Sequence, residues 1–161
     1  MTNDADSGRI FSGEAPVTSG RFAIVVSKYN DGITRKLLDG AQATLIAAGV
    51  PAGEIDVAWV PGAFEIPLVA HRLAGSGEYV AVICLGAVIK GDTSHDEHIN
   101  RAVSLGLTEA ALASGVPVLF GVLTCDTLEQ AIHRSGGNVG NKGVESAQAA
   151  LEMVSLLEQL P

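Results

Sequence analysis

The sequence predicts an α/β domain, a three-layer αβα sandwich in which a four-stranded parallel sheet lies between helices. Two observations predict this class. Four short segments are almost wholly apolar, and each is followed by a segment with the features of a helix. Strands that are apolar on both sides are typical of a parallel sheet with both faces covered. The 161 residues suffice for one domain, which we place at residues 10–161 after a polar, disordered tail over residues 1–9.

The bulk composition argues against several classes of protein. The net charge of −8 disfavours nucleic-acid binding, which needs a basic surface. The N-terminal segment is acidic and polar, unlike an export signal, and the apolar runs are shorter than the roughly 20 residues that span a membrane. We therefore expect a cytoplasmic protein. Hydrophobic residues make up 47% of the chain and charged residues only 17%, so we also expect self-association.

The first elements follow from apolar runs and cap residues. Residues 10–17 form an apolar arm, in which Pro16 permits only an edge strand. Residues 21–27 predict the first strand of the sheet, and Asp31 is placed to cap a helix that runs to about residue 48. One face of this helix carries Ile33, Leu37, Ala41 and Leu45.

The second strand is predicted over residues 55–60, where apolar residues again dominate. Pro61 and Gly62 then turn the chain, and Pro67 suits the first turn of a helix that ends at Gly75. A proline is tolerated there because the N–H it lacks would be unpaired in any case.

The third strand, residues 79–89, is rich in Val and Ile. It ends before Gly91, and Thr93 or Ser94 can cap a helix that runs to about residue 114. The start of this helix leaves unpaired backbone N–H groups at the positive end of its dipole. Such a place suits a phosphate or a carboxylate.

The fourth strand is predicted over residues 116–124, and Asp126 or Thr127 starts a short helix that ends near Gly136. Residues 135–143 are predicted to form a loop. An amphipathic helix closes the chain. Its apolar side carries Val144, Ala147, Leu151 and Val154.

Three unusual loops follow the first three strands: SKYN at 27–30, PGAFE at 61–65 and KGDTSH at 90–95. Right-handed crossovers bring the carboxyl ends of parallel strands to the same edge of a sheet, where ligands bind. We therefore expect the three loops to form one site.

His95 lies beside the predicted anion site. Residues 86–93 nearly match a nucleotide-binding P-loop, but Asp92 replaces the lysine of that motif and would repel the β- and γ-phosphates of ATP or GTP. Backbone N–H groups could still bind a ligand with a single phosphate. His95 and His98 share a helix face without an H-E-x-x-H pattern or a clear third ligand, so we expect no metal. Histidine exchanges protons near neutral pH, which favours acid–base work for His95 over a bond to nearby backbone.

Other candidate residues allow two interpretations each. Glu65 at a helix start either complements the helix dipole or accepts hydrogen bonds from a polyol or amine. Tyr29 and Phe64 are either core aromatics or rings on which a flat ligand stacks. Arg134 and Lys142 flank the glycine-rich loop and, by sequence alone, are best explained as solvated charges.

Six motifs together resemble the 6,7-dimethyl-8-ribityllumazine synthase family over about residues 10–160. They are FAIVVSKYN, VPGAFEIP, GAVIKGDTSHDEHI, PVLFGVLT, LEQAIHRSGG and GNKG, in this order. The resemblance implies a flavodoxin-like sheet and a transferase of riboflavin biosynthesis that uses no cofactor. Family members condense 5-amino-6-(D-ribitylamino)uracil with 3,4-dihydroxy-2-butanone 4-phosphate and release phosphate and water.

The resemblance also assigns roles to residues. His95 matches the proton-transfer residue, and Asp92 and Thr93 match the phosphate-binding pair. The positions that match residues around the pyrimidine and its ribityl chain are Tyr29, Ala63, Phe64, Glu65, Ala87, Val88 and Ile89. Phe120 and Arg134 match residues that family members lend from a neighbouring subunit, Arg134 to the phosphate, and Lys142 of the GNKG motif is expected to assist. The chain departs from the family at residues 96–98, where an aromatic, an acid and another aromatic are usual.

The resemblance further implies a homo-oligomer with active sites between subunits. Pentamers, assembled into an icosahedral capsid of 60 subunits, are expected, and the arm should add a strand to a neighbour's sheet. Riboflavin synthase is a candidate partner. Two rival interpretations remain open: a binding module that holds a phosphorylated ligand or flavin, and a shell protein whose site is inactive.

Overall fold

The computed structural model describes residues 7–17 and 19–161. Its elements are β1 (Arg21–Ser27), α1 (Asp31–Ala47), η1 (Ala52–Glu54), β2 (Ile55–Val60), η2 (Ala63–Glu65), α2 (Ile66–Ala74), β3 (Tyr79–Ile89), α3 (His95–Ser114), β4 (Val118–Cys125), α4 (Leu128–His133), β5 (Ser135–Gly137), β6 (Gly140–Asn141) and α5 (Lys142–Gln159).

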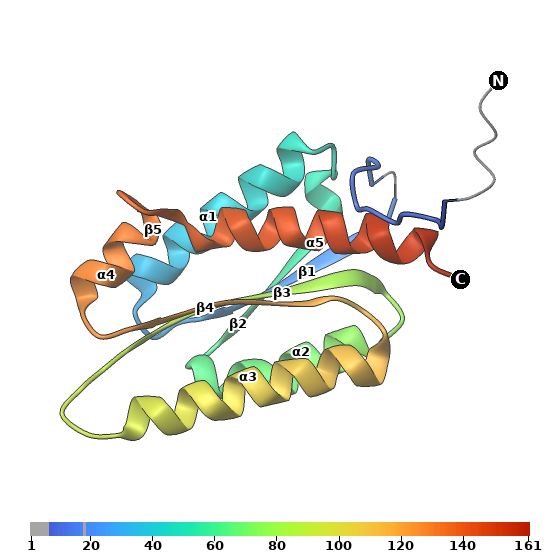
Figure 1. The fold of residues 1–161 in the computed structure, drawn as a ribbon. Coiled ribbons are helices and arrows are strands. Elements are labelled where there is room, and N and C mark those ends of the chain that lie inside the picture. The colour runs from blue at the N-terminus through green and yellow to red at the C-terminus, as the bar shows by residue number, and fades with distance from the viewer. Residues whose placement is uncertain (1–6, 18) are drawn as a thin grey trace.

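Four parallel strands form the central sheet in the order β2-β1-β3-β4. Helices α1 and α5 cover one face, and α2 and α3 cover the other (Figure 1). The α/β class and the flavodoxin-like three-layer arrangement expected from the sequence are thus confirmed.

Each face of the sheet has its own apolar core. Phe22 and Ile24 of β1 belong to one cluster with Leu37 of α1. Val25 points to the opposite face, where it belongs to a second cluster with Ile66 of α2. Successive residues of a strand point to opposite faces, so a strand buried on both sides must be largely apolar, as residues 22–26 of β1 are.

The start of α1 differs from the prediction. Asp31 is the first helical residue and not the cap; the cap position is Asn30, in the left-handed conformation with φ 61°. Asparagine tolerates this conformation better than most residues. The Asn30 side chain does not cap the helix and bonds elsewhere, as described below. The predicted apolar face of α1 is buried as expected.

The prediction of an irregular loop over residues 135–143 was also wrong. Strands β5 and β6 pair there in a short antiparallel hairpin, and α5 already begins at Lys142. The preceding helix behaves as predicted, because Thr127 Oγ1 accepts a hydrogen bond from the Gln130 N–H and caps α4. Strand β4 begins at Val118, two residues later than predicted.

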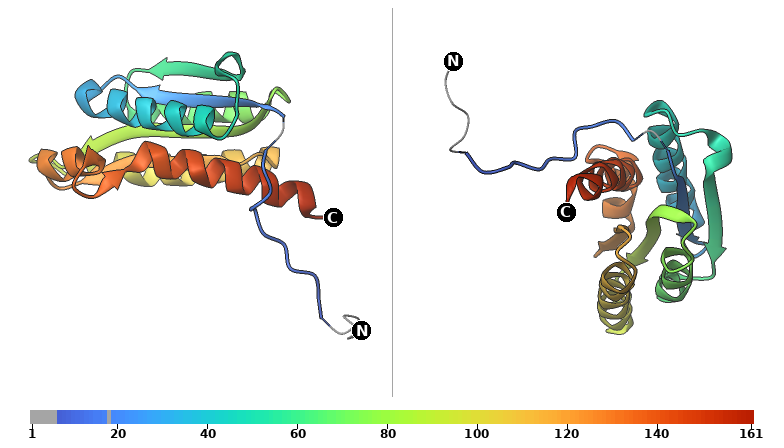
Figure 2. Two further views of the ribbon diagram at one scale, coloured as in Figure 1. Left: turned by 90° about the horizontal axis from the view of Figure 1, so that it is seen from above. Right: turned by 90° about the vertical axis from the view of Figure 1, so that its right-hand side faces the viewer.

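The N-terminal arm crosses α5 near the end of that helix (Figure 2). The Gln159 side-chain amide donates to the Ser12 carbonyl, and a Cβ on Gly13 would overlap the Glu152 carbonyl. Residues 7–17 contain no strand in the single chain. Pairing with a neighbour's sheet therefore stays a prediction, and most of the tail predicted over residues 1–9 lies outside the described residues.

Strand β3 extends past β1 at its carboxyl end. The last pair between the two strands joins Val26 and Leu85, whereas Ile89 still pairs with Cys125 of β4. Strand β2 lies on one side of β1 and β3 on the other, so the sheet reverses its order at this point. In parallel sheets, ligands bind at such a switch point.

Over the described ranges, every helix is too short or too polar to cross a lipid bilayer.

Candidate functional site

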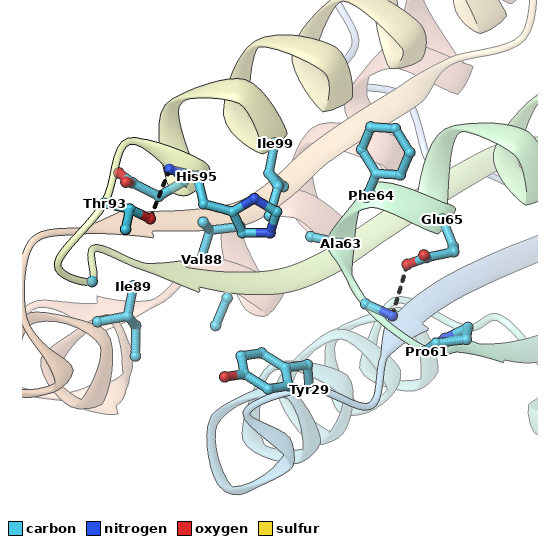
Figure 3. A pocket seen from close by; sticks show the side chains of 14 residues that line it. Tyr29, Pro61, Ala63, Phe64, Glu65, Val88, Ile89, Thr93, His95 and Ile99 are labelled. Atoms are coloured by element: carbon cyan, nitrogen blue, oxygen red, sulfur yellow. Dashed lines mark hydrogen bonds between the residues drawn. The ribbon is translucent and has the colours of Figure 1, made fainter.

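A hollow of about 580 Å³ opens where the sheet reverses its order, and we call it the rim hollow (Figure 3). It receives residues from the loops after β1, β2 and β3. They are Tyr29, Pro61, Gly62, Ala63, Phe64, Glu65, Ala87, Val88, Ile89, Gly91, Thr93, His95, Asp96 and Ile99. The three loops that the sequence singled out therefore meet in one place.

The loop after β1 presents Tyr29 to the rim hollow and is anchored on both sides. The Tyr29 side chain is 73% exposed, so it is a rim residue and not a core aromatic. Its N–H donates to the Pro61 carbonyl at 3.0 Å. The neighbouring Asn30 Nδ2 donates to the Ala87 carbonyl at 2.9 Å. The left-handed backbone of Asn30 turns the chain into α1 and thereby leaves the ring facing the hollow.

Residues 87–89 at the end of β3 line the rim hollow. Ala87 and Val88 are buried, so their side chains belong to the core. In the described structure no strand pairs with residues 87–89 on the side of β1, because β1 has ended. Exposed peptide groups along a strand end can hydrogen-bond the edge of a flat polar ring.

The loop after β2 forms η2 and presents Phe64 and Glu65. Phe64 is 61% exposed, so this ring also belongs to the rim. The Glu65 Oε2 atom accepts a hydrogen bond from the Gly62 N–H at 3.0 Å (Figure 3). One carboxylate oxygen of Glu65 therefore serves the helix start, as the first interpretation expected. Within the described residues the other oxygen has no protein donor, so it can accept from a ligand.

The start of α3 holds His95 at the opposite side of the hollow from Tyr29. The imidazole projects toward Ala63 (Figure 3). Ser94 occupies the cap position without a side-chain cap, and Thr93 Oγ1 accepts from the His95 N–H at a long 3.4 Å. Asp92 is exposed just outside the lining residues. The positive end of this 20-residue helix therefore opens at the rim hollow.

A second hollow of about 570 Å³ lies at the carboxyl end of β4, and we call it the cationic hollow. It is lined by Phe120, Val122, Leu123, Thr124, Cys125, Gln130, His133, Arg134, Val139 and Lys142. The resemblance connects Phe120 and Arg134 with a neighbouring subunit and gives Lys142 an assisting role. They share this hollow, and the structure does not place them among the residues that line the rim hollow.

One backbone hydrogen bond joins the two residues that carry the cations of this hollow. The Lys142 N–H donates to the Arg134 carbonyl at 2.8 Å. The Lys142 ammonium also pairs with Glu145 at 3.1 Å.

Burial raises the pKa of the nearby Cys125 thiol, and the positive charge of Arg134 opposes this shift. Cys84 in β3 is wholly buried, and burial raises the pKa of its thiol far above the ordinary range, so this thiol stays protonated and unreactive.

The charges of the two hollows are opposite. Among the described residues that line the rim hollow, the acids are Glu65 and Asp96, and no Arg or Lys occurs. The lining of the cationic hollow, as far as the structure describes it, contains no Asp or Glu. A phosphate in the rim hollow could thus bind to the start of α3, but no Arg or Lys of the described lining residues would neutralise its charge.

The sequence predictions assigned no role in the site to Asp96 and Ile99, which line the rim hollow, or to Asn30, which anchors the loop that carries Tyr29. Asparagine before a helix is a recognisable signal for a left-handed residue, but its bond to Ala87 depends on the fold. Asp96 Oδ1 is buried and has no hydrogen-bond partner among the described residues. In residues 7–17 and 19–161, no group of three or more His, Cys, Asp or Glu side chains is arranged to hold a metal.

One protein family matches the chain over nearly its whole length. The family model described as 6,7-dimethyl-8-ribityllumazine synthase covers residues 19–158. The match includes all of the strands and almost all of α5, so it spans both hollows.

Proposed function

The chain belongs to the 6,7-dimethyl-8-ribityllumazine synthase family, and from this premise we propose its reaction and its site. We propose that the protein condenses 5-amino-6-(D-ribitylamino)uracil with 3,4-dihydroxy-2-butanone 4-phosphate to form 6,7-dimethyl-8-ribityllumazine. The observation that carries the proposal is the division of the candidate residues between two hollows of opposite charge.

The rim hollow suits the pyrimidine substrate. The exposed ring of Tyr29 can stack on a flat heterocycle. The backbone of residues 87–89 can hydrogen-bond the polar edge of that heterocycle, as strand ends do for other ligands. The free oxygen of Glu65 is placed to accept from the hydroxyls of the ribityl chain, with Ala63 and Phe64 beside it.

The start of α3 suits the reacting part of the second substrate. Backbone N–H groups near Asp92 and Thr93, at the positive end of the helix, favour a phosphate. The exposed imidazole of His95 lies beside them and can move protons between the substrates.

The chemistry requires proton transfers and positioning. The substrate amine attacks the ketone and forms an imine with loss of water. Elimination then releases phosphate, and the second nitrogen attacks the remaining carbonyl to close the ring with loss of a second water. Each step moves a proton that His95 can take or return. Holding both substrates together contributes several kcal/mol through proximity.

A neighbouring subunit would complete the site. A substrate phosphate at the start of α3 needs more positive charge than the rim hollow supplies, and Arg134 and Lys142 offer it from the cationic hollow. We propose that this hollow of one copy, with Phe120, faces the rim hollow of the next. A ring of five copies would satisfy every such interface. We further propose the 60-subunit shell and a cytoplasmic location; light scattering that shows only pentamers would contradict the shell.

The test is a product assay on the purified protein. Both substrates are mixed with it, and lumazine fluorescence and free phosphate are measured over time. We expect product and phosphate to appear in equal amounts. Binding of either substrate without product would contradict the proposed reaction and favour the binding module, whereas an assembled shell that binds neither substrate would favour an inactive shell protein.

A further inference from the structure

The side-chain amide of Asn141 joins two helices beside the cationic hollow. Its Oδ1 atom accepts hydrogen bonds from the N–H groups of Gly143 at 2.8 Å and Val144 at 3.1 Å, and so caps α5. Its Nδ2 atom donates to the Lys36 carbonyl of α1 at 3.1 Å. One amide group therefore fixes the start of α5 and ties it to α1.

The two helices approach so closely here that a larger residue would not fit at two positions. A Cβ on Gly143 would lie 1.9 Å from the Leu37 carbonyl oxygen. A Cβ on Gly40 would lie 2.8 Å from the amide atoms of Asn141. Because real Cβ atoms do not approach other atoms so closely, both glycines are needed for the Asn141 amide to remain against α1.

The backbone next to Asn141 carries both cations of the hollow. Asn141 pairs with Ser135 in the β5–β6 hairpin. The residues that follow and precede this pair, Lys142 and Arg134, are joined by the N–H to carbonyl bond of 2.8 Å. The Asn141 amide thus holds the one stretch of backbone from which both cationic side chains extend.

The side chains of Arg134 and Lys142 are held less firmly than the backbone that carries them. In the described part of the chain, the Arg134 guanidinium has no carboxylate within salt-bridge distance. Lys142 pairs only with the exposed Glu145, and an exposed pair holds its partners weakly. The relative position of the two cations therefore depends on the backbone that carries them.

We propose that Asn141 is a positioning residue, which holds the backbone that carries Arg134 and Lys142 in a fixed place against α1, where the two cations can bind one phosphate group. This inference rests on the proposed function, in which these cations bind the phosphate of the second substrate. The bond from Nδ2 to Lys36 is the part that positions them. The cap made by Oδ1 serves the helix start and can be supplied by other residue types.

The variant Asn141→Ser separates the two roles. Serine is a good cap for a helix start, but its side chain is too short to reach α1 and carries no charge that would disturb phosphate binding. We expect the KM for the phosphate substrate to rise roughly threefold to tenfold, as the loss of one hydrogen bond to the scaffold suggests. The KM for the pyrimidine substrate should stay near the wild-type value, and the melting temperature should fall only slightly, because the cap is kept.

Two further variants serve as controls. Asn141→Ala removes the cap as well, so it should show the same change in KM together with a clear fall in melting temperature. Ser114→Ala removes hydrogen bonds to Ala110 and Val116 at the far end of α3. It should lower the melting temperature without a change in either KM. An Asn141→Ser protein with unchanged phosphate KM, or with both KM values raised equally, would overturn the proposal.

Inorganic phosphate provides a readout that does not need turnover. Line broadening of its phosphorus NMR signal by the wild-type protein, lost in Arg134→Ala, would show that the cations bind it. Weaker broadening by Asn141→Ser would support the positioning role, and broadening equal to the wild type would overturn it. If the wild type makes no lumazine, the proposed reaction fails, yet this phosphate comparison still decides the role of Asn141.

Discussion

The rim hollow and the cationic hollow are built in different ways. The rim hollow draws its lining from residues as far apart in the chain as Tyr29 and Ile99, which meet because three parallel strands end at one edge. The cationic hollow draws its lining only from residues between Phe120 and Lys142, which are neighbours along the chain. One region depends on the whole sheet, and the other depends on a local hairpin and the bonds of Asn141.

The two hollows also differ in what they lack. The rim hollow has a histidine, two acids and exposed aromatic rings, but no Arg or Lys among its described lining residues. The cationic hollow has Arg134 and Lys142, but no acid among its described lining residues. Neither hollow alone contains all the groups that the proposed reaction needs. The difference between the hollows indicates that the edge of the sheet holds the histidine and the aromatic rings, whereas the cations proposed to bind the phosphate lie beside β4.

The largest effect is expected in the rim hollow, from His95→Ala. A positioned histidine typically contributes about 10²- to 10⁴-fold to rate, so kcat should fall by this factor while both KM values change little. Steady-state kinetics with the fluorescent product measures it. Residual activity should remain, since the substrates are still held together. Complete loss of turnover with both substrates bound would show that the histidine does more than transfer protons.

A smaller effect of a different kind is expected in the cationic hollow, from Arg134→Ala. Hydrogen bonds to a charged group contribute about 1.5 to 3 kcal/mol, so the KM for the phosphate substrate should rise roughly 10- to 100-fold. The KM for the pyrimidine substrate should change little, because that ring is expected in the other hollow. The same kinetic assay provides the measurement. An unchanged phosphate KM would remove Arg134 from the site.

Mixed oligomers test whether the two hollows of different copies work together. His95→Ala and Arg134→Ala chains are coexpressed in equal amounts and assayed at low phosphate-substrate concentration. If neighbouring copies complete each site, about one quarter of the interfaces in a random ring combine two intact hollows. Activity should therefore recover to about this fraction of the wild-type rate. If each chain forms its site alone, the mixture will be no more active than the average of the two variants.

The smallest effect is expected at the opposite edge of the sheet. There the Arg21 guanidinium and the Tyr79 hydroxyl both donate to the Asp56 carboxylate, and these bonds hold the pKa of Asp56 below its usual range. A carboxyl whose pKa is lower in the folded than in the unfolded state stabilises the fold above about pH 4. This contribution is lost as the pH falls through the folded-state pKa.

The variant Asp56→Asn should therefore lose stability at neutral pH and show a flatter decline in acid. Thermal unfolding between pH 7 and pH 3 measures this, with Asp39→Asn on the exposed side of α1 as the control. Both KM values should be unchanged, because Asp56 lines neither hollow. An Asp56→Asn protein whose acid profile matches that of the wild type would show that these bonds contribute no pH-dependent stability.

Much of the fold could be predicted because it depends on short stretches of chain. The runs that became β1, β2 and β3 are mostly apolar, and a run of this kind has few alternatives to a strand of a covered sheet. The start of α4 was predicted at Asp126 or Thr127, and Thr127 caps it, because a hydroxyl next to a helix start has a nearby donor.

The failures came where a distant partner decided the outcome. Asp31 is a suitable cap residue by type, yet Asn30 takes the cap position, and its side chain reaches Ala87 in another strand. Residues 135–143 contain four glycines and resemble a loop. They form a hairpin whose end is tied to α1 by Asn141, a bond that no local pattern announces.

The amino-acid sequence alone determined the class of fold, the edge of the sheet where a ligand should bind and the residue types that the proposed chemistry needs. Periodic burial and turn chemistry depend on residues that are close along the chain, so the sequence pattern alone indicates them. Only the tertiary structure decided which candidates share a hollow and that the cations lie apart from His95. These relations join residues that are remote in sequence, and they exist only once the strands have taken their order in the sheet.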